Sequence, residues 1–124
     1  MKQSPLKSFV SALALCAAFA AQGQSPGQSP WPDKPITMIV PFPPGGVADT
    51  VARPVAEALS RELKQTVIVE NRVGAGGALG MGAAARAAPD GNTVMMTLSS
   101  ITVLPEADKI LGRKPAFTLN QFRQ

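Results

Sequence analysis

The chain contains no histidine and one cysteine, Cys16, and these scarcities exclude several kinds of functional site. Without histidine, neither a Ser-His-Asp triad nor an imidazole metal site can form. A single cysteine provides neither an intrachain disulfide nor a thiolate metal cluster. Cys16 follows Leu15 rather than a small residue, which argues against a lipoprotein. We therefore expect a non-enzymatic protein with no catalytic residues, no metal and no cofactor.

Long runs of one charge are also missing. The formal net charge is +4, from twelve Lys/Arg and eight Asp/Glu that are scattered along the sequence. Proteins that bind nucleic acids usually have clustered basic residues interleaved with aromatic side chains, and no such cluster occurs here. We therefore expect no nucleic-acid partner.

The first residues have the pattern of an export signal. Lys2 and Lys7 are followed by an apolar stretch of small residues, 9–21, that is too short to span a bilayer comfortably. The A-F-A sequence at 18–20 predicts cleavage before Ala21, with A-Q-G at 21–23 as a second option. An uncleaved membrane anchor is the alternative.

This interpretation predicts a signal peptide at residues 1–20, a periplasmic location, and loss of Cys16 with the signal. Residues 21–33 are polar and rich in Gly, Ser and Pro, and they predict a flexible tether. The remaining residues, 34–124, are long enough for only part of one ordinary domain.

Residues 34–124 read as strand, helix, strand, helix, strand, which predicts an α/β fold with a parallel sheet. The continuous apolar run at 36–40 predicts a strand buried on both faces. The other elements that we expect are strands at 67–69 and 93–98, a small-residue helix at 78–87, and a short helix within 104–111.

A helix is expected after the first strand, with Asp49 at its N-cap or in its first turn. Apolar residues four apart predict its buried stripe: Val51, Val55, Leu59 and Leu63. Pro54 conflicts with a regular helix, so either the helix begins near Arg53 or it bends there.

Two Pro/Gly-rich turns link these elements, with the sequences P-F-P-P-G-G at 41–46 and G-A-G-G at 74–77. A strand, a glycine turn and a helix N-terminus together aim backbone N–H groups at one point, which suits anion binding. Gly45 and Gly46 allow positive φ, and at Gly46 we expect positive φ or close approach of a ligand.

Three ordered motifs, P-F-P-P-G-G-x-x-D (41–49), V-E-N-R-x-G-A-G-G (69–77) and A-A-P-D-G-N-T (87–93), resemble one family. It is the Bug family, the periplasmic substrate-binding proteins of tripartite tricarboxylate transporters. The resemblance implies a periplasmic-binding-protein-like fold with two α/β domains around a cleft, of which this chain matches the first half of domain 1. It also implies capture of a small carboxylate solute and its delivery to a membrane permease.

The resemblance carries a set of ligand-binding residues over to this sequence. They come from a first loop, a second loop and the turn after the third strand: Phe42, Pro43, Pro44, Gly45, Gly46 and Asp49; Gly74, Ala75, Gly76 and Gly77; and Ser99 and Ser100. For several of them a structural role is an open alternative: core packing for Phe42, a helix cap for Asp49, and turn formation for the serines.

Two other functions are compatible with the sequence. An exported α/β enzyme that binds a phosphate on its glycine loops is one, but a dinucleotide fingerprint fails because Leu79 stands where the third glycine belongs. An inactive truncated gene product is the other.

Overall fold

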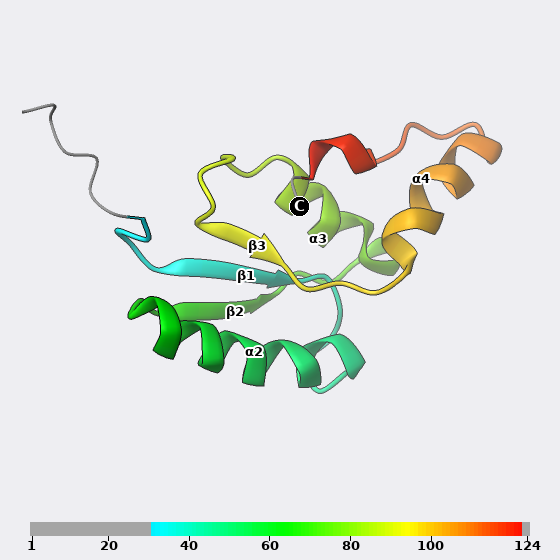
Figure 1. The fold of residues 1–124 in the computed structure, drawn as a ribbon. Coiled ribbons are helices and arrows are strands. Elements are labelled where there is room, and N and C mark those ends of the chain that lie inside the picture. The colour runs from blue at the N-terminus through cyan, green and yellow to red at the C-terminus, as the bar shows by residue number, and fades with distance from the viewer. Residues whose placement is uncertain (1–30, 123–124) are drawn as a thin grey trace, which may run out of the picture.

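The computed structural model describes residues 31–122. The predicted signal peptide with Cys16, and the predicted tether up to residue 30, lie outside the described residues. Figure 1 shows a three-stranded sheet with α2 on one face and α3 on the other. The arrangement confirms the predicted α/β fold with a parallel sheet.

The sheet has the order β2-β1-β3, and both pairings are parallel. The strands are β1 (Ile36–Val40), β2 (Val67–Asn71) and β3 (Thr93–Met95). Ile36 lies opposite Val67, and Thr37 lies opposite Thr93. The first strand in the sequence is thus the central strand of the sheet.

The central position of β1 explains its largely apolar sequence, in which Thr37 is the one polar residue. Ile36, Met38, Ile39 and Val40 are each at most 3% exposed, because helices cover both faces of this strand. Parallel strands with helices on both faces are typically apolar at every position. The predicted bounds of β1, and its burial on both faces, are confirmed.

Helix α2 (Val47–Leu63) packs on β1 and β2 through alanines rather than through the predicted stripe. Its buried apolar residues are Ala48, Ala52 and Ala56, which form a core cluster with Met38 and Val40. Val51 is 49% exposed, so the predicted stripe is wrong at that position. Alanines four apart let the helix approach the sheet closely, and the larger residues Val55 and Leu59 pack at the margin of the cluster.

The same helix excludes one of the two alternatives drawn from Pro54, a start near Arg53. Regular helix begins at Val47 and continues through Pro54 to Leu63, so the helix does not start near Arg53. Pro54 is exposed, and its missing N–H leaves the carbonyl of Thr50 without its usual helical partner. Packing of the alanine face against the sheet outweighs this local cost.

Helix α3 (Ala78–Ala85) covers the opposite face, against β1 and β3. A methyl group at Gly80 would lie 2.5 Å from the carbonyl oxygen of Arg72 and 2.7 Å from Cβ of Pro41. The absence of a side chain therefore lets the helix touch the backbone beyond both β1 and β2. This close approach accounts for the glycine at position 80.

The remaining bounds differ from the predicted ones at the strand ends. β2 is two residues longer than expected, whereas β3 ends at Met95, three residues early. Met96 still donates a hydrogen bond to the carbonyl of Ile39. Beyond it, helix α4 (Ser100–Ile110) starts before the predicted position and contains Pro105. Two short 3₁₀ turns complete the structure, η2 (Ala75–Gly77) and η3 (Leu119–Gln121).

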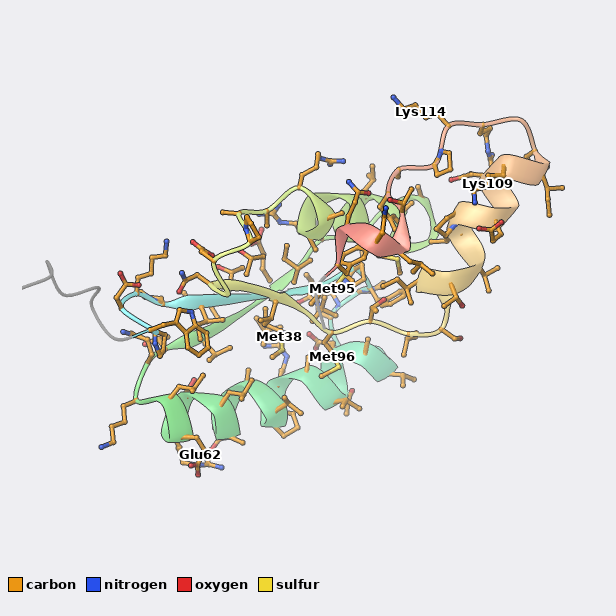
Figure 2. All side chains as sticks on the ribbon, turned by 45° about the horizontal axis from the view of Figure 1, so that its top comes forward. Met38, Glu62, Met95, Met96, Lys109 and Lys114 are labelled. Atoms are coloured by element: carbon orange, nitrogen blue, oxygen red, sulfur yellow. The ribbon has the colours of Figure 1, made fainter. Side chains whose placement is uncertain are left out.

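The residue that follows β3 packs into the layer beneath α2. Met96 joins Met38 in the cluster beneath α2, and both lie in the interior in Figure 2. The charged side chains of Glu62, Lys109 and Lys114 lie at the periphery of the same view. Within residues 31–122, none of the helices has the length and apolar character needed to cross a membrane.

Candidate functional site

The loops that follow the three strands lie at one edge of the sheet, because all strands run in the same direction. Ligands of open parallel sheets bind at this carboxyl edge. The first and second loops touch there: a methyl group at Gly77 would lie 3.3 Å from Cε1 of Phe42. Helix α4 also reaches this edge, since a methyl group at Gly76 would lie 3.9 Å from Cδ2 of Leu104.

In the first loop, positive φ occurs at Gly45 and not at Gly46. Gly45 has φ of +77°, whereas Gly46 has φ of −73° and extended backbone. Of the two alternatives expected at Gly46, positive φ is therefore wrong, and close approach of a ligand stays a prediction. The amide of Gly46 donates to the carbonyl of Pro43 at 3.2 Å, which closes the turn that leads into α2. Pro43 and Pro44 are both exposed on this turn.

The N-terminus of α2 is not capped by a side chain. The amides of Val47, Ala48 and Asp49 have no hydrogen-bond acceptor among residues 31–122. The first amides of any helix lack an intrahelical partner, and the helix dipole places partial positive charge there. This end of α2 therefore presents donors at the edge where the loops meet, and such donors attract an anion.

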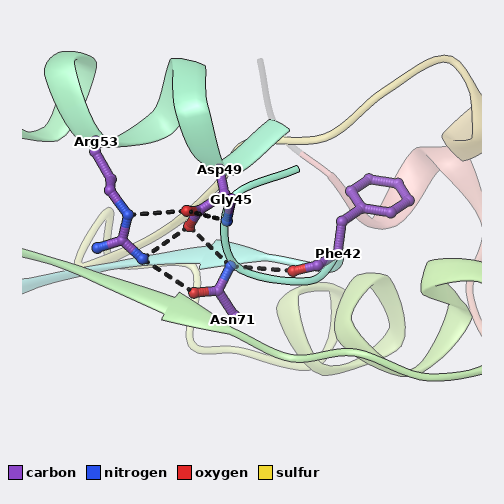
Figure 3. A network of polar contacts seen from close by, with 5 residues as sticks. All are labelled: Phe42, Gly45, Asp49, Arg53 and Asn71. Carbon is purple, nitrogen blue, oxygen red and sulfur yellow. Dashed lines mark hydrogen bonds and ion pairs between the residues drawn. The ribbon is translucent and has the colours of Figure 1, made fainter. Parts of the chain in front are cut away.

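Asp49 lies in the first turn of α2, is 2% exposed, and is fully occupied by internal contacts (Figure 3). Its Oδ2 accepts from the Gly45 amide at 2.8 Å and from Arg53 Nε at 2.9 Å. Its Oδ1 accepts from Arg53 Nη2 and from Asn71 Nδ2, both at 2.9 Å. Hydrogen bonds from Arg53, the Gly45 amide and Asn71 lower the pKa of Asp49 to about 2.

Because the pKa of Asp49 is lowered on folding, its ionised form stabilises the fold above its ordinary pKa of 3.8. This stabilisation is lost as the pH falls through about 2, since the proton then breaks the contacts. We expect the melting temperature of the chain to fall as the pH is lowered from 3.8 to about 2. In Asp49→Asn, the melting temperature should fall less over the same pH range. Asp90, whose pKa hydrogen bonds from Asn92 and Lys34 also lower to about 2, contributes to the same drop. Calorimetry at several pH values tests this, and an unchanged slope in Asp49→Asn would contradict it.

The second loop combines glycines with one strained residue. Ala75 has φ of +48°, a conformation that is uncommon for any residue with a side chain and that often accompanies function. Gly77 donates its amide to the carbonyl of Gly74 at 2.9 Å, which closes a tight turn ahead of α3. The half-buried ring of Phe42 packs on Gly77, so Phe42 lies between the two loops.

Two residues outside the predicted set, Asn71 and Arg53, are central to this edge. Asn71 Nδ2 donates to the Phe42 carbonyl at 3.0 Å as well as to Asp49. In the sequence, the spacing of Asp49 and Arg53, four apart on a helix, indicates an ion pair. The 22-residue separation of Asn71 from Asp49 hides their contact. Arg72 pairs instead with Glu70 at 2.7 Å and is about half exposed.

Ser99 and Ser100 lie where α4 begins. Ser99 occupies the N-cap position but makes no side-chain cap, and its carbonyl accepts from Thr102 Oγ1 at 2.8 Å. The hydroxyl of Ser100 is buried and has no partner among the described residues, and the same holds for Thr97. Buried hydroxyls without partners are uncommon, so this turn has unused hydrogen-bonding capacity.

A hollow of about 550 Å³ lies between α3, β3, the start of α4 and the C-terminal segment. Val94, Met95, Ile101 and Phe122 supply much of its apolar lining, and no predicted site residue borders it. The described residues contain no group of three or more acidic or cysteine side chains placed to hold a metal ion.

Comparison with known proteins gives a family for the sequence. Residues 51–123 match the model described as the tripartite tricarboxylate transporter family receptor. The matched segment contains the second loop, Ser99 and Ser100. The chain is also 51% identical over 70 residues to the protein BugT of Bordetella pertussis, covering 56% of this chain and 22% of that protein.

Solved structures agree with this match. A periplasmic transporter aligns with a TM-score of 0.61 and 47% identity, over 68% of this chain and 29% of its own. The protein MatC from Rhodopseudomonas palustris, solved with bound malate, aligns with a TM-score of 0.51 and 43% identity, over 52% and 22%. The chain spans between 22% and 33% of the length of the curated relatives it matches.

Proposed function

Because the chain belongs to the tripartite tricarboxylate transporter receptor family, we propose that it forms part of a periplasmic solute-binding protein. The solute is a small organic acid whose carboxylate is held by the loops at 42–49 and 74–77 and by the turn at Ser99 and Ser100. The bound solute is then presented to a membrane permease. No chemical conversion is involved, and the protein acts by capture and delivery.

The observation that carries the proposal is the uncapped N-terminus of α2. The amides of Val47 and Ala48 have no acceptor among the described residues, and they lie beside the first loop. The negative charge nearest to them, Asp49, is paired with Arg53 and faces inward. The edge therefore offers donors without an uncompensated negative charge, which suits a carboxylate.

The malate-bound similar structure supports the solute class, since malate carries two carboxylates and one hydroxyl. Main-chain donors recognise the carboxylate group itself and leave the rest of the solute to other contacts. The hydroxyl of Ser100 is a further donor of suitable type at the same edge. A two-domain receptor would close over the solute from the side opposite these loops.

Titration of the chain with malate, followed through backbone amide NMR signals, tests the proposal. We expect the signals of Val47, Ala48 and Gly76 to move together. The chain would supply the contacts on only one side of a two-domain site, so we expect weak binding. A dissociation constant on the order of 1 mM corresponds to a binding free energy of about −4 kcal/mol.

The uncharged diamide of malate is the matched control, because it keeps the shape and removes the negative charge. We expect it to leave the same signals in place. Equal responses to malate and its diamide, or malate responses confined to exposed lysines, would contradict a main-chain carboxylate site.

A further inference from the structure

One side-chain amide connects the two loops of the proposed carboxylate site (Figure 3). Asn71 is the last residue of β2, so the second loop begins immediately after it. Its Nδ2 donates to the carbonyl of Phe42 in the first loop at 3.0 Å and to Asp49 Oδ1 at 2.9 Å. A single amide group thus joins the first loop, the first turn of α2 and the start of the second loop.

Asp49 and Arg53 hold this amide in a single orientation. Asp49 accepts hydrogen bonds on both carboxylate oxygens, so Asn71 must present its NH₂ group to it. On the other side, Arg53 Nη2 donates to Asn71 Oδ1 at 3.4 Å. If the amide were flipped by 180°, its NH₂ group would face the NH₂ group of Arg53, and two donors would oppose each other. The donor and acceptor ends of Asn71 are therefore fixed by charges of opposite sign.

Asp49 itself has no free position for a solute. Its two oxygens receive four hydrogen bonds, and the residue is almost completely buried. A buried carboxylate is tolerated when it is paired and hydrogen-bonded in this way. Its partners are the first loop (Gly45), helix α2 (Arg53) and the end of β2 (Asn71), so its influence on a solute is indirect.

Resting on the function proposed above, we propose that Asn71 is a positioning residue that fixes the first loop relative to the second. Asp49 and Arg53 act with it by holding its amide in place. The unit does not contact the solute. It sets the spacing at which the donors of α2 and those of the second loop meet one carboxylate, and misplaced donors lose most of their binding energy.

Asn71→Leu is the sharpest test, because it keeps the approximate size of the side chain and removes both N–H donors without adding a charge beside Asp49. We expect malate binding, measured through the amide signals of Val47 and Gly76, to weaken about tenfold or more. Without malate, we expect hydrogen exchange to accelerate together at the amides of Gly45 and Gly77. A local defect would affect only the loop that lost its bond.

Two arginines on α2 provide a matched control. Arg53 pairs with Asp49 and Arg61 pairs with Glu57, both four residues apart on the same helix, but only Arg53 belongs to the unit. We expect Arg53→Gln to weaken malate binding several-fold and Arg61→Gln to leave it unchanged. Arg53→Lys keeps the charge but loses the two-pronged contact, so it should recover part of the affinity.

The outcomes separate this proposal from the one it rests on. If the chain binds malate, and Asn71→Leu and Arg53→Gln bind it equally well with unchanged exchange rates, the positioning role is refuted while the carboxylate site stands. If the chain does not bind malate, the proposed function fails. Hydrogen exchange at the amides of Gly45 and Gly77 then still tests the positioning role. Faster exchange in both loops supports it, and faster exchange in the first loop alone overturns it. If Asn71→Leu does not fold, the comparison of Arg53→Gln with Arg61→Gln decides the positioning role.

Discussion

Replacing Gly80 with alanine is expected to destabilise the chain by about 1–3 kcal/mol, although alanine is the better helix former. The added methyl group would lie 2.5 Å from the Arg72 carbonyl oxygen, 2.7 Å from Pro41 Cβ and 2.9 Å from Pro41 Cα. All three atoms belong to backbone or to a proline ring, so no flexible side chain can give way. Helix α3 must instead move away from the ends of β1 and β2.

Gly82→Ala in the same helix is the matched control for this prediction. Its methyl group would lie 3.1 Å from the end of the Arg86 side chain and 3.2 Å from the Ala116 carbonyl. These contacts need only small adjustments, so the gain in helix propensity of about 1 kcal/mol should roughly offset them. Chemical denaturation of both variants tests the difference. Equal stability of Gly80→Ala and Gly82→Ala would show that the close approach at Gly80 is not required.

Gly80→Ala should also displace the first and second loops. Pro41 opens the first loop and Arg72 opens the second, and Gly80 touches both. Gly80, which lets α3 approach the sheet, therefore also helps to determine the positions of Pro41 and Arg72. Stability and site geometry depend on the same contact.

The sequence predicts the central strand well because one strong pattern determines it. A run such as Ile36–Val40, in which Thr37 is the one polar residue, is typical of a strand covered on both faces, and the structure covers both. The buried face of α2 was harder to predict. Two stripes with the same four-residue spacing compete, and hydrophobicity favours the Val/Leu stripe, whereas close packing selects Ala48, Ala52 and Ala56.

The predicted loops come together, but what holds them together is not visible in the local sequence. Asn71 reaches Phe42 across 29 residues, and nothing in the motif around either residue indicates that contact. The choice between Gly45 and Gly46 for positive φ likewise depends on the bond from the Gly45 amide to Asp49. Local propensity allows either glycine, and a contact formed only in the folded state selects one.

Gly45→Val is expected to weaken malate binding at least about tenfold, because valine is strongly disfavoured at the φ of +77° found there. Nothing lies within 4 Å of the position a side chain would take, so the substitution causes no clash. Its whole cost is conformational, about 1–3 kcal/mol. The loop can relieve it only by giving up the Gly45–Asp49 contact that leads into the first turn of α2.

Gly45→Asn separates backbone conformation from the mere presence of a side chain. Asparagine also adds a side chain into the same open space, but it tolerates positive φ far better than valine. We therefore expect Gly45→Asn to retain most of the malate affinity that Gly45→Val loses. Equal losses in both variants would mean that the side chain, and not the backbone, obstructs the site.

Arg72→Ala completes the comparison, since Arg72 is the cation nearest in sequence to the second loop. Its guanidinium is paired with Glu70 at 2.7 and 3.1 Å and is about half exposed, so its charge is already compensated. If main-chain donors hold the carboxylate, removing this side chain should change malate affinity less than about twofold. Calorimetric titration of Gly45→Val, Gly45→Asn and Arg72→Ala with malate compares how much each residue contributes to binding. A large loss in Arg72→Ala together with full binding in Gly45→Val would assign the anion to a side-chain cation and refute the main-chain site.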